Sequence, residues 1–187
     1  EAQGKVTGNT TININSSITV DGNIYGGSNG VINGTTINTN TGLITGDTNI
    51  TLNVGTIKGD IYGGGNNCGE TGNANININN GQVTGNIYGG AYQNQVQTST
   101  NINILGGTVQ NIYGGNILTT QTQQNADTAS ENTTIVIGSK DATTIPTING
   151  TIYGSGKYDR IGTVEIQLVK SATLPTIYGG SDGAGIT

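Results

Sequence analysis

The sequence predicts an all-β protein of the parallel β-solenoid class, with three short strands per turn of about 25 residues and about six turns. Two observations predict this fold. A four-residue word, Ile-Tyr-Gly-Gly or a near copy, returns six times along the 187 residues, and a run of alternating aliphatic and polar residues stands before each copy. Helical periodicity, with apolar residues three and four positions apart, is not seen in the chain.

The repeated word sets the period of the chain. Successive copies begin 37, 26, 25, 40 and 25 residues apart, so two intervals look like the basic period with an added segment. We expect those insertions near 30–47 and 116–134, and we expect 1–187 to be a single solenoid segment of a longer repetitive protein. The six copies are Ile24–Gly27, Ile61–Gly64, Ile87–Gly90, Ile112–Gly115, Ile152–Ser155 and Ile177–Gly180.

The alternating runs predict the first strand of each turn. A period of two places isoleucine on one face of a strand and asparagine or threonine on the other, so we expect isoleucine to point inward. Stacked asparagines such as Asn77 and Asn103 should then hydrogen-bond from turn to turn. The runs are Thr11–Ile14, Asn49–Leu52, Asn75–Ile78, Asn101–Ile104, Thr134–Ile137 and Thr163–Ile166.

A second short segment and then the Ile-Tyr-Gly-Gly word complete each unit, with glycine or Asn-Gly between the segments. The chain has 33 glycines and no Phe, Trp, Met or His, so its core must be built from β-branched aliphatic residues. One unit buries too little apolar surface to order itself. We therefore expect neighbouring repeats of the same chain to be the partners that complete the core.

Two stretches resemble the β-helical repeats of large bacterial cell-surface adhesins, as found in autotransporter passenger regions and in Gram-positive surface proteins. These stretches are Gly85–Gly90 and Asn101–Val109. The resemblance implies a right-handed parallel β-helix that is secreted and displayed outside the cell. It implies a non-enzymatic structural or adhesive role in cell adhesion, as a stalk or as a surface that binds host or matrix glycans or proteins.

The tyrosines of the repeated word are the candidate ligand-binding residues. Alternation from an inward isoleucine sends each tyrosine outward, and stacking should align the six in a ladder on which sugar rings could lie. In the alternative interpretation, the rings cover the glycine backbone of the adjacent turn. The ladder residues are Tyr25, Tyr62, Tyr88, Tyr113, Tyr153 and Tyr178.

Composition bounds the remaining functions. A formal net charge of −5 argues against nucleic-acid binding, and no apolar run is long enough to insert into a membrane. Without histidine and with Cys68 alone, the residues offer no nucleophile–base pair involving histidine and no cysteine-based metal site, so we expect no catalytic residues, no metal and no cofactor. Outward residues lack the regular Thr-x-Thr array of an ice-binding face, and the nine-residue period of stacked calcium sites is also missing.

Two alternatives to the structural and adhesive module stay open at this stage. One is a carbohydrate-binding module that uses the tyrosine ladder or the polar loop at 116–134. The other is a pectin-lyase-like, polysaccharide-active β-helix, which would need clustered carboxylates or a basic residue in a groove. The charged cluster Lys157, Asp159 and Arg160 reads as solvated surface in a turn, and Cys68 reads as an incidental turn thiol.

Overall fold

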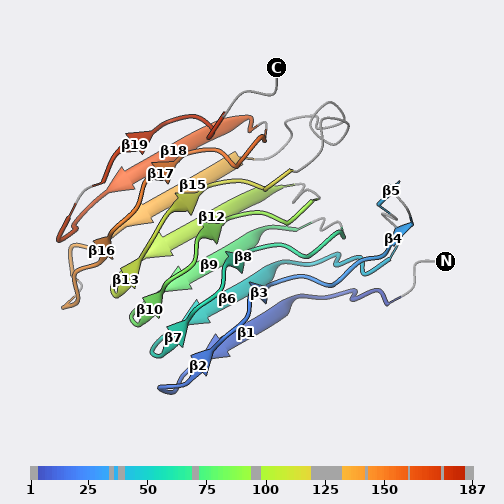
Figure 1. Ribbon diagram of the computed structural model, residues 1–187, viewed down its shortest axis with the longest axis horizontal. Helices are drawn as coiled ribbons and strands as arrows, with labels where there is room; N and C mark the ends of the chain where they lie inside the picture. Colours follow the sequence, from blue (N-terminus) through green and yellow to red (C-terminus); the bar gives the residue numbers. More distant parts are fainter. Residues whose placement is uncertain are drawn as a thin grey trace.

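The computed structural model describes residues 4–33, 36–37, 41–68, 72–93, 98–118, 132–141, 143–159, 161–173 and 175–183. Within these residues every regular element is a β-strand, and the strands build three parallel sheets in regular order (Figure 1). No described helix is long and apolar enough to cross a membrane. The all-β prediction is therefore confirmed, and the strand order is consistent with a β-solenoid.

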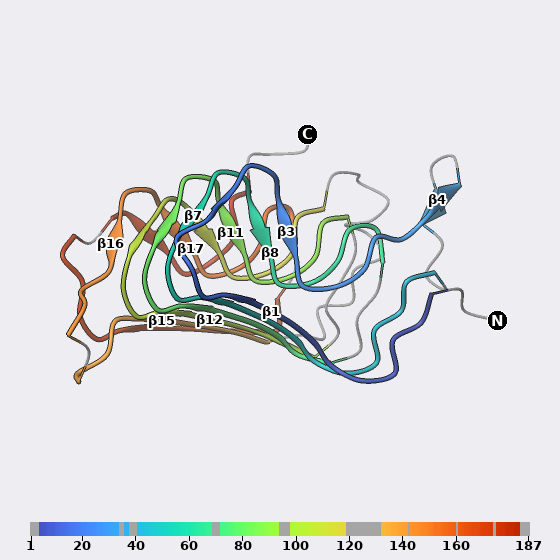
Figure 2. The same cartoon turned by 90° about the horizontal axis from the view of Figure 1, so that it is seen from below.

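The first sheet contains the long strands that the alternating runs predict. Each pairs in parallel and in register with its equivalent in the next repeat, so that Ile50 aligns with Ile76 and Ile76 with Ile102. The sheet forms one wall of the molecule (Figure 2). Its strands, in spatial order, are β1 (Thr10–Ile14), β6 (Thr48–Leu52), β9 (Ala74–Ile78), β12 (Ser99–Ile104), β15 (Asn132–Ile137) and β18 (Thr163–Leu168).

Two sheets of two-residue strands lie opposite this wall. The second sheet holds β2 (Thr19–Val20), β7 (Thr56–Ile57), β10 (Gln82–Val83), β13 (Thr108–Val109) and β16 (Thr147–Ile148). The third sheet is made by the Ile-Tyr pairs of the repeated word: β3 (Ile24–Tyr25), β8 (Ile61–Tyr62), β11 (Ile87–Tyr88), β14 (Ile112–Tyr113), β17 (Ile152–Tyr153) and β19 (Ile177–Tyr178). The chain thus visits the three sheets in the same order in the first five repeats, and in the last an isolated bridge from Thr173 to Thr147 takes the place of the second strand.

The predicted insertions depart from this regularity. Within 30–47, β4 (Ile32–Asn33) pairs antiparallel with β5 (Thr36–Ile37), apart from the parallel sheets. Ile44 in the same stretch makes a parallel bridge with Val6. Most of the second insertion, 119–131 of 116–134, lies outside the described residues.

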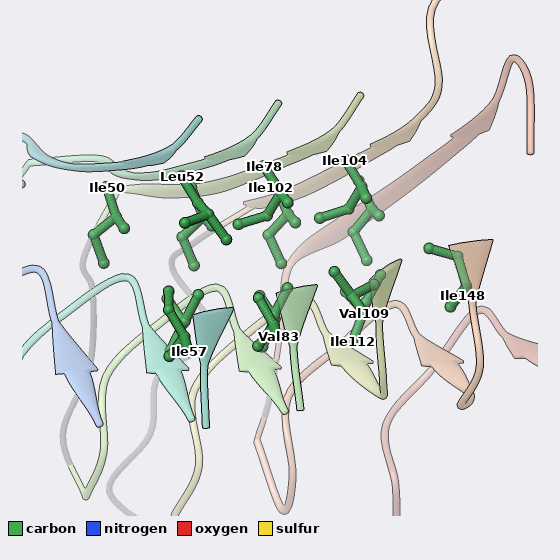
Figure 3. Packing of buried hydrophobic residues seen from close by; sticks show 14 of the residues in the cluster. Ile50, Leu52, Ile57, Ile78, Val83, Ile102, Ile104, Val109, Ile112 and Ile148 are labelled. Atoms are coloured by element: carbon green, nitrogen blue, oxygen red, sulfur yellow. The ribbon is translucent and has the colours of Figure 1, made fainter. Parts of the chain in front are cut away.

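Isoleucine fills the space between the sheets. Ile50, Leu52, Ile78, Ile102 and Ile104 point from the first sheet toward side chains of the second and third, and all are fully buried (Figure 3). In the four inner strands of the first sheet, buried positions alternate with half-buried or exposed ones. The inward direction predicted for isoleucine is confirmed.

The first glycine of the repeated word is required by close approach of the next repeat. A Cβ atom at Gly63, Gly89 or Gly114 would overlap the carbonyl oxygen of the equivalent glycine in the following repeat. Glycine also stands where the chain leaves the first sheet: Gly55 and Gly81 have φ values of 110° and 98°, which side-chain-bearing residues rarely adopt.

Buried or half-buried threonines connect the first sheet to the third. The Oγ1 atoms of Thr10 and Thr48 donate hydrogen bonds of 2.6 Å to the carbonyl oxygens of Gly26 and Gly63. Thr100 makes the same bond to Gly114, which satisfies a polar atom that the core would otherwise leave unpaired.

Asparagine ladders run along the stack as predicted. Asn103 Nδ2 donates to Asn77 Oδ1 at 2.9 Å, and a second ladder passes from Asn101 to Asn75 and from Asn75 to Asn49. Asn75 uses both its donor and its acceptor along the stack, so the ladders add inter-repeat hydrogen bonds on the outer face of the first sheet.

Candidate functional site

The six tyrosines of the repeated word form one continuous stack, because in-register pairing of the third sheet places each ring over the next. Neighbouring ring centroids are 4.7 to 5.3 Å apart with interplanar angles of 4° to 14°. Rings at this separation are in stacking contact. The structure therefore brings all six predicted site residues together in a ladder.

Solvent reaches this ladder unevenly. The rings lie in a cluster separate from the isoleucine core, as the outward direction predicts. The exposed fraction is nevertheless only 3%, 4% and 7% for Tyr62, Tyr88 and Tyr113. Tyr25 and Tyr153 are half-buried, and Tyr178 is 53% exposed. The outward direction therefore does not leave the three central rings open to solvent, and ligand binding on the ladder stays a prediction.

A column of residues four positions after each tyrosine lies beside the ladder. Its members are joined from repeat to repeat by isolated parallel bridges. Tyr92 meets Tyr62 edge to face at a centroid distance of 5.6 Å, and Ile117 packs on the same aromatic cluster. We call this set the covering column: Asn29, Asn66, Tyr92, Ile117, Lys157 and Asp182. Its apolar members cover the middle of the ladder.

The tyrosine hydroxyls border a polar ladder on the residues just before each Ile-Tyr pair. Tyr62 donates to Asp60 Oδ2 at 3.1 Å, while Asp60 Oδ1 accepts from the backbone N–H of Asn86. Asn111 Nδ2 donates in turn to Asn86 Oδ1 at 2.8 Å. A carboxylate is thus held inside a ladder of amides, within reach of the phenols.

Burial and negative charge together disfavour tyrosinate. Burial, and then the neighbouring Asp60 carboxylate, raise the pKa of Tyr62 and of Tyr88 above the ordinary value of 10.0. Burial, followed by the charge of Asp182, raises the pKa of Tyr113 to about 12. The central phenols therefore stay protonated at neutral pH, where they serve as hydrogen-bond donors and packing groups.

In repeats where the covering-column residue is polar instead of Tyr92 or Ile117, two hollows lie beside the ladder. One, of about 350 Å³, is lined by Tyr25, Gly27, Ser28, Asn29 and Asn66. The other, of about 300 Å³, is lined by Tyr153, Tyr178, Ser181, Asp182 and Gly183. The first combines an aromatic ring with amides and a hydroxyl and carries no ionisable side chain besides the phenol. The second adds a carboxylate.

The sequence did not predict the covering column or these two hollows. The column could have been found from the sequence, since every column member follows a ladder tyrosine by four residues. The residue type at that position varies from repeat to repeat, so it does not stand out as part of the motif. The two hollows lie beside polar members of the column, and its apolar members pack on the central rings.

The charged cluster near the last repeats differs from its prediction. Asp159 is 7% exposed, so the expectation of a solvated carboxylate is wrong. Its Oδ2 atom accepts a hydrogen bond from the backbone N–H of Asn116 at 2.6 Å and another from the Asn116 side chain at 3.1 Å. A neighbouring repeat thus supplies the donors that a buried carboxylate needs. Lys157 is half-buried, and Arg160 lies outside the described residues.

The chemistry available at these positions is stacking and hydrogen bonding. Among the described residues no group of three or more Cys, Asp or Glu side chains is placed to hold a metal ion. Cys68 is fully buried, and its thiol donates to the carbonyl oxygen of Ser28 at 2.8 Å. Comparison with protein-family models, with curated proteins and with solved structures found no match in any of the three.

Proposed function

We propose that the chain is a right-handed parallel β-helix, with three short strands per turn of about 25 residues and about six turns. We further propose that it serves as a non-enzymatic structural and adhesive module on a bacterial cell surface. One observation carries the proposal: the same side chains align in register through successive repeats of every sheet. At about 4.8 Å per turn, six turns extend roughly 25–30 Å, and added repeats would lengthen the rod without altering its cross-section.

The surface chemistry supports an extracellular role. Charged residues make up 9% of the chain, and the outer face of the first sheet carries asparagine amides that bond to one another from repeat to repeat. Such a face is polar without attracting polyanions, and its inter-repeat hydrogen bonds do not depend on salt. These are useful properties in a stalk that separates a binding surface from a cell envelope.

Location and adhesion are tested separately. Antibodies raised against this chain should label intact cells of the source organism as strongly as lysed cells. Purified protein should bind immobilised host or matrix glycans or proteins above the level of a heat-unfolded sample. Labelling that requires lysis would contradict a surface location, and failure to bind any immobilised ligand would remove the adhesive part of the proposal.

The non-enzymatic part has its own assay. A pectin-lyase-like β-helix would release unsaturated uronides from polymeric substrates, which absorb in the ultraviolet. We expect no absorbance increase above the rate of a buffer control. Steady product formation that scales with protein concentration would show the protein to be a polysaccharide-active enzyme instead.

A carbohydrate-binding module is the second candidate, favoured by the hollow at Tyr25. A half-buried ring beside Ser28, Asn29 and Asn66 offers the mixture of stacking and amide hydrogen bonding that a neutral sugar ring uses. On a glycan array, Asn29→Ala should weaken any neutral-glycan signal, while Asn13→Ala on the far sheet should leave it unchanged. Equal signals from both variants would place binding elsewhere.

A further inference from the structure

The side chains that lose an electron most readily are concentrated in one place. The chain has eight tyrosines but no Trp, Met or His, and its single cysteine is buried. Burial shields a thiol from reagents in solution. Six of the eight tyrosines form the ladder, and Tyr92 contacts it edge to face. The tyrosine cluster is therefore the main store of removable electrons in this chain.

Ring contact allows an electron vacancy to move along the ladder. From Tyr62 to Tyr153, neighbouring ring centroids are 4.7 to 5.0 Å apart. Electron transfer falls steeply with distance, so rings in stacking contact exchange an electron readily. Tyr92 is half-buried and meets Tyr62 at a centroid distance of 5.6 Å. An oxidant in solution thus has a route to the buried rings through Tyr92, without touching them itself.

Tyr62 has a proton acceptor beside it. A tyrosine that has lost an electron becomes a strong acid, so it holds the vacancy best where its proton has a place to go. The Tyr62 hydroxyl donates to Asp60 Oδ2 at 3.1 Å, and Asp60 Oδ1 accepts from the backbone N–H of Asn86 at 2.7 Å. The second bond fixes the carboxylate toward the phenol. Its negative charge also stabilises a vacancy on the adjacent ring.

This arrangement distinguishes Tyr62 from the other rungs. At the residue just before the Ile-Tyr pair, the other five repeats have an amide or a hydroxyl, which does not take up a proton at neutral pH. A second carboxylate, Asp182 of the covering column, lies near Tyr113 and has to be separated from Asp60 by experiment. The residues at the position of Asp60 are Asn23, Asn86, Asn111, Thr151 and Thr176.

We propose that the tyrosine ladder is a one-electron donor that traps oxidising radicals, and that the resulting radical settles on Tyr62. An oxygen-centred radical takes one electron from the ladder and one proton from the buffer, and becomes a hydroxyl or hydroperoxide compound. The vacancy passes to Tyr62, its Oη–H bond breaks, and the proton moves to Asp60 Oδ2. The products on the protein are a neutral tyrosyl radical and a protonated carboxyl group.

Burial suits Tyr62 to hold a radical. Only 3% of this residue is exposed, so two such radicals on different molecules cannot meet and couple. Burial and the Asp60 charge also raise the pKa of Tyr62, which keeps the proton on the phenol until the electron leaves. The reaction is stoichiometric, with one radical consumed for each electron given up. It does not depend on an adhesive role for the chain.

Light-driven oxidation tests the proposal. Tris(bipyridine)ruthenium(III), generated by a laser flash with a cobalt(III) ammine as quencher, removes one electron from the protein. Electron paramagnetic resonance and transient visible absorbance then record the tyrosyl radical and its decay. Tyr62→Phe keeps a stacked ring without the hydroxyl and should abolish the long-lived signal. Tyr158→Phe, which changes a half-buried ring outside the ladder, should leave that signal unchanged.

Asp60→Asn is the central variant, because asparagine occupies this position in three other repeats and is compatible with the fold. It should shorten the lifetime of the radical by about tenfold, the factor that corresponds to a hydrogen bond with a charged group. Asp47→Asn is the matched control. Asp47 Oδ1 also accepts a backbone N–H from the next repeat, that of Asn73 at 2.8 Å, and Asp47 bonds to no tyrosine in the described part of the chain. This control and Asp182→Asn should both keep the wild-type lifetime.

Three results would overturn the proposal. Equal radical lifetimes in the wild type and Asp60→Asn would show that Asp60 is not the proton acceptor. Loss of the signal in Tyr158→Phe but not in Tyr62→Phe would place the radical outside the ladder. Loss in Asp182→Asn but not in Asp60→Asn would place it on Tyr113. Far-ultraviolet circular dichroism checks that each variant is folded, and if Tyr62→Phe unfolds, the comparison of Asp60→Asn with Asp47→Asn decides.

Discussion

Substitution of Gly89 by alanine isolates the close approach between repeats on which the stack depends. An added Cβ would lie well inside 3.0 Å of the Gly114 carbonyl oxygen, a separation that real Cβ atoms essentially never show. Restoring ordinary contact at 3.4 Å requires the two repeats to separate locally by about 1 Å or more. Backbone bonds that now measure 2.8 to 2.9 Å would then exceed hydrogen-bonding distance.

The expected cost follows from what that separation breaks. Three inter-repeat hydrogen bonds, donated by Ile87, Gly89 and Gly90, lie at this point, and each contributes about 1 kcal/mol. Loss of the Tyr88–Tyr113 stacking contact adds about 1 kcal/mol. Gly89→Ala should therefore reduce the free energy of unfolding by about 3–5 kcal/mol.

Gly179→Ala is the matched control, because Gly179 occupies the equivalent position in the last described repeat and an added Cβ there would meet no atom within 4 Å. Urea denaturation followed by far-ultraviolet circular dichroism should give a change within about 0.5 kcal/mol for this control. Equal stability of the two variants would refute the reasoning that close carbonyl approach makes glycine necessary in the repeated word.

Three further predictions address the ladder, the inter-sheet bond and the buried thiol. The raised pKa values of Tyr62, Tyr88 and Tyr113 stabilise the folded state with these phenols protonated, so this stabilisation is complete below pH 10 and is lost as pH rises toward and beyond 12. Absorbance at 295 nm should show these three phenols ionising late, together with unfolding. Ionisation of all eight tyrosines near pH 10 in the folded state would contradict this prediction. Thr100→Val removes the hydrogen bond to the third sheet and should cost about 1–2 kcal/mol in chemical denaturation, whereas an unchanged midpoint would show that bond to be dispensable. Cys68 should react with an aromatic disulfide reagent only as fast as the surrounding structure opens, and complete reaction within seconds in native buffer would disagree with its burial.

The sequence predicted the parts of the fold that depend on short-range periodicity. Alternation in a run such as Asn75–Ile78 determines which side chains face inward, and the spacing of the Ile-Tyr-Gly-Gly word determines which strands become neighbours. The aromatic ladder followed from those two facts, because in-register pairing leaves a repeated tyrosine no other position. The asparagine ladders follow in the same way.

Interactions between residues far apart in the chain could not be predicted in this way. Burial of Tyr62 depends on Tyr92, which reaches it from the next repeat, and no local pattern shows that approach. Asp159 lies close to Lys157 and Arg160 in the sequence, which favours a solvated turn, but Asn116, 43 residues earlier, supplies hydrogen-bond donors that allow its burial. The covering column varies in residue type from one repeat to the next, and only the structure shows that its apolar members pack on the central tyrosines while hollows lie beside some of its polar members.

The central claim is that equivalent side chains of successive repeats lie side by side, and paired cysteines measure this directly. With Cys68 replaced by serine, Asn77→Cys and Asn103→Cys should form a disulfide on mild oxidation, because register partners on neighbouring parallel strands have Cα atoms about 4.8 Å apart. Asn77→Cys with Asn101→Cys, two residues out of register and roughly 8 Å apart, should remain reduced. Rapid oxidation of the second pair in place of the first would contradict the account.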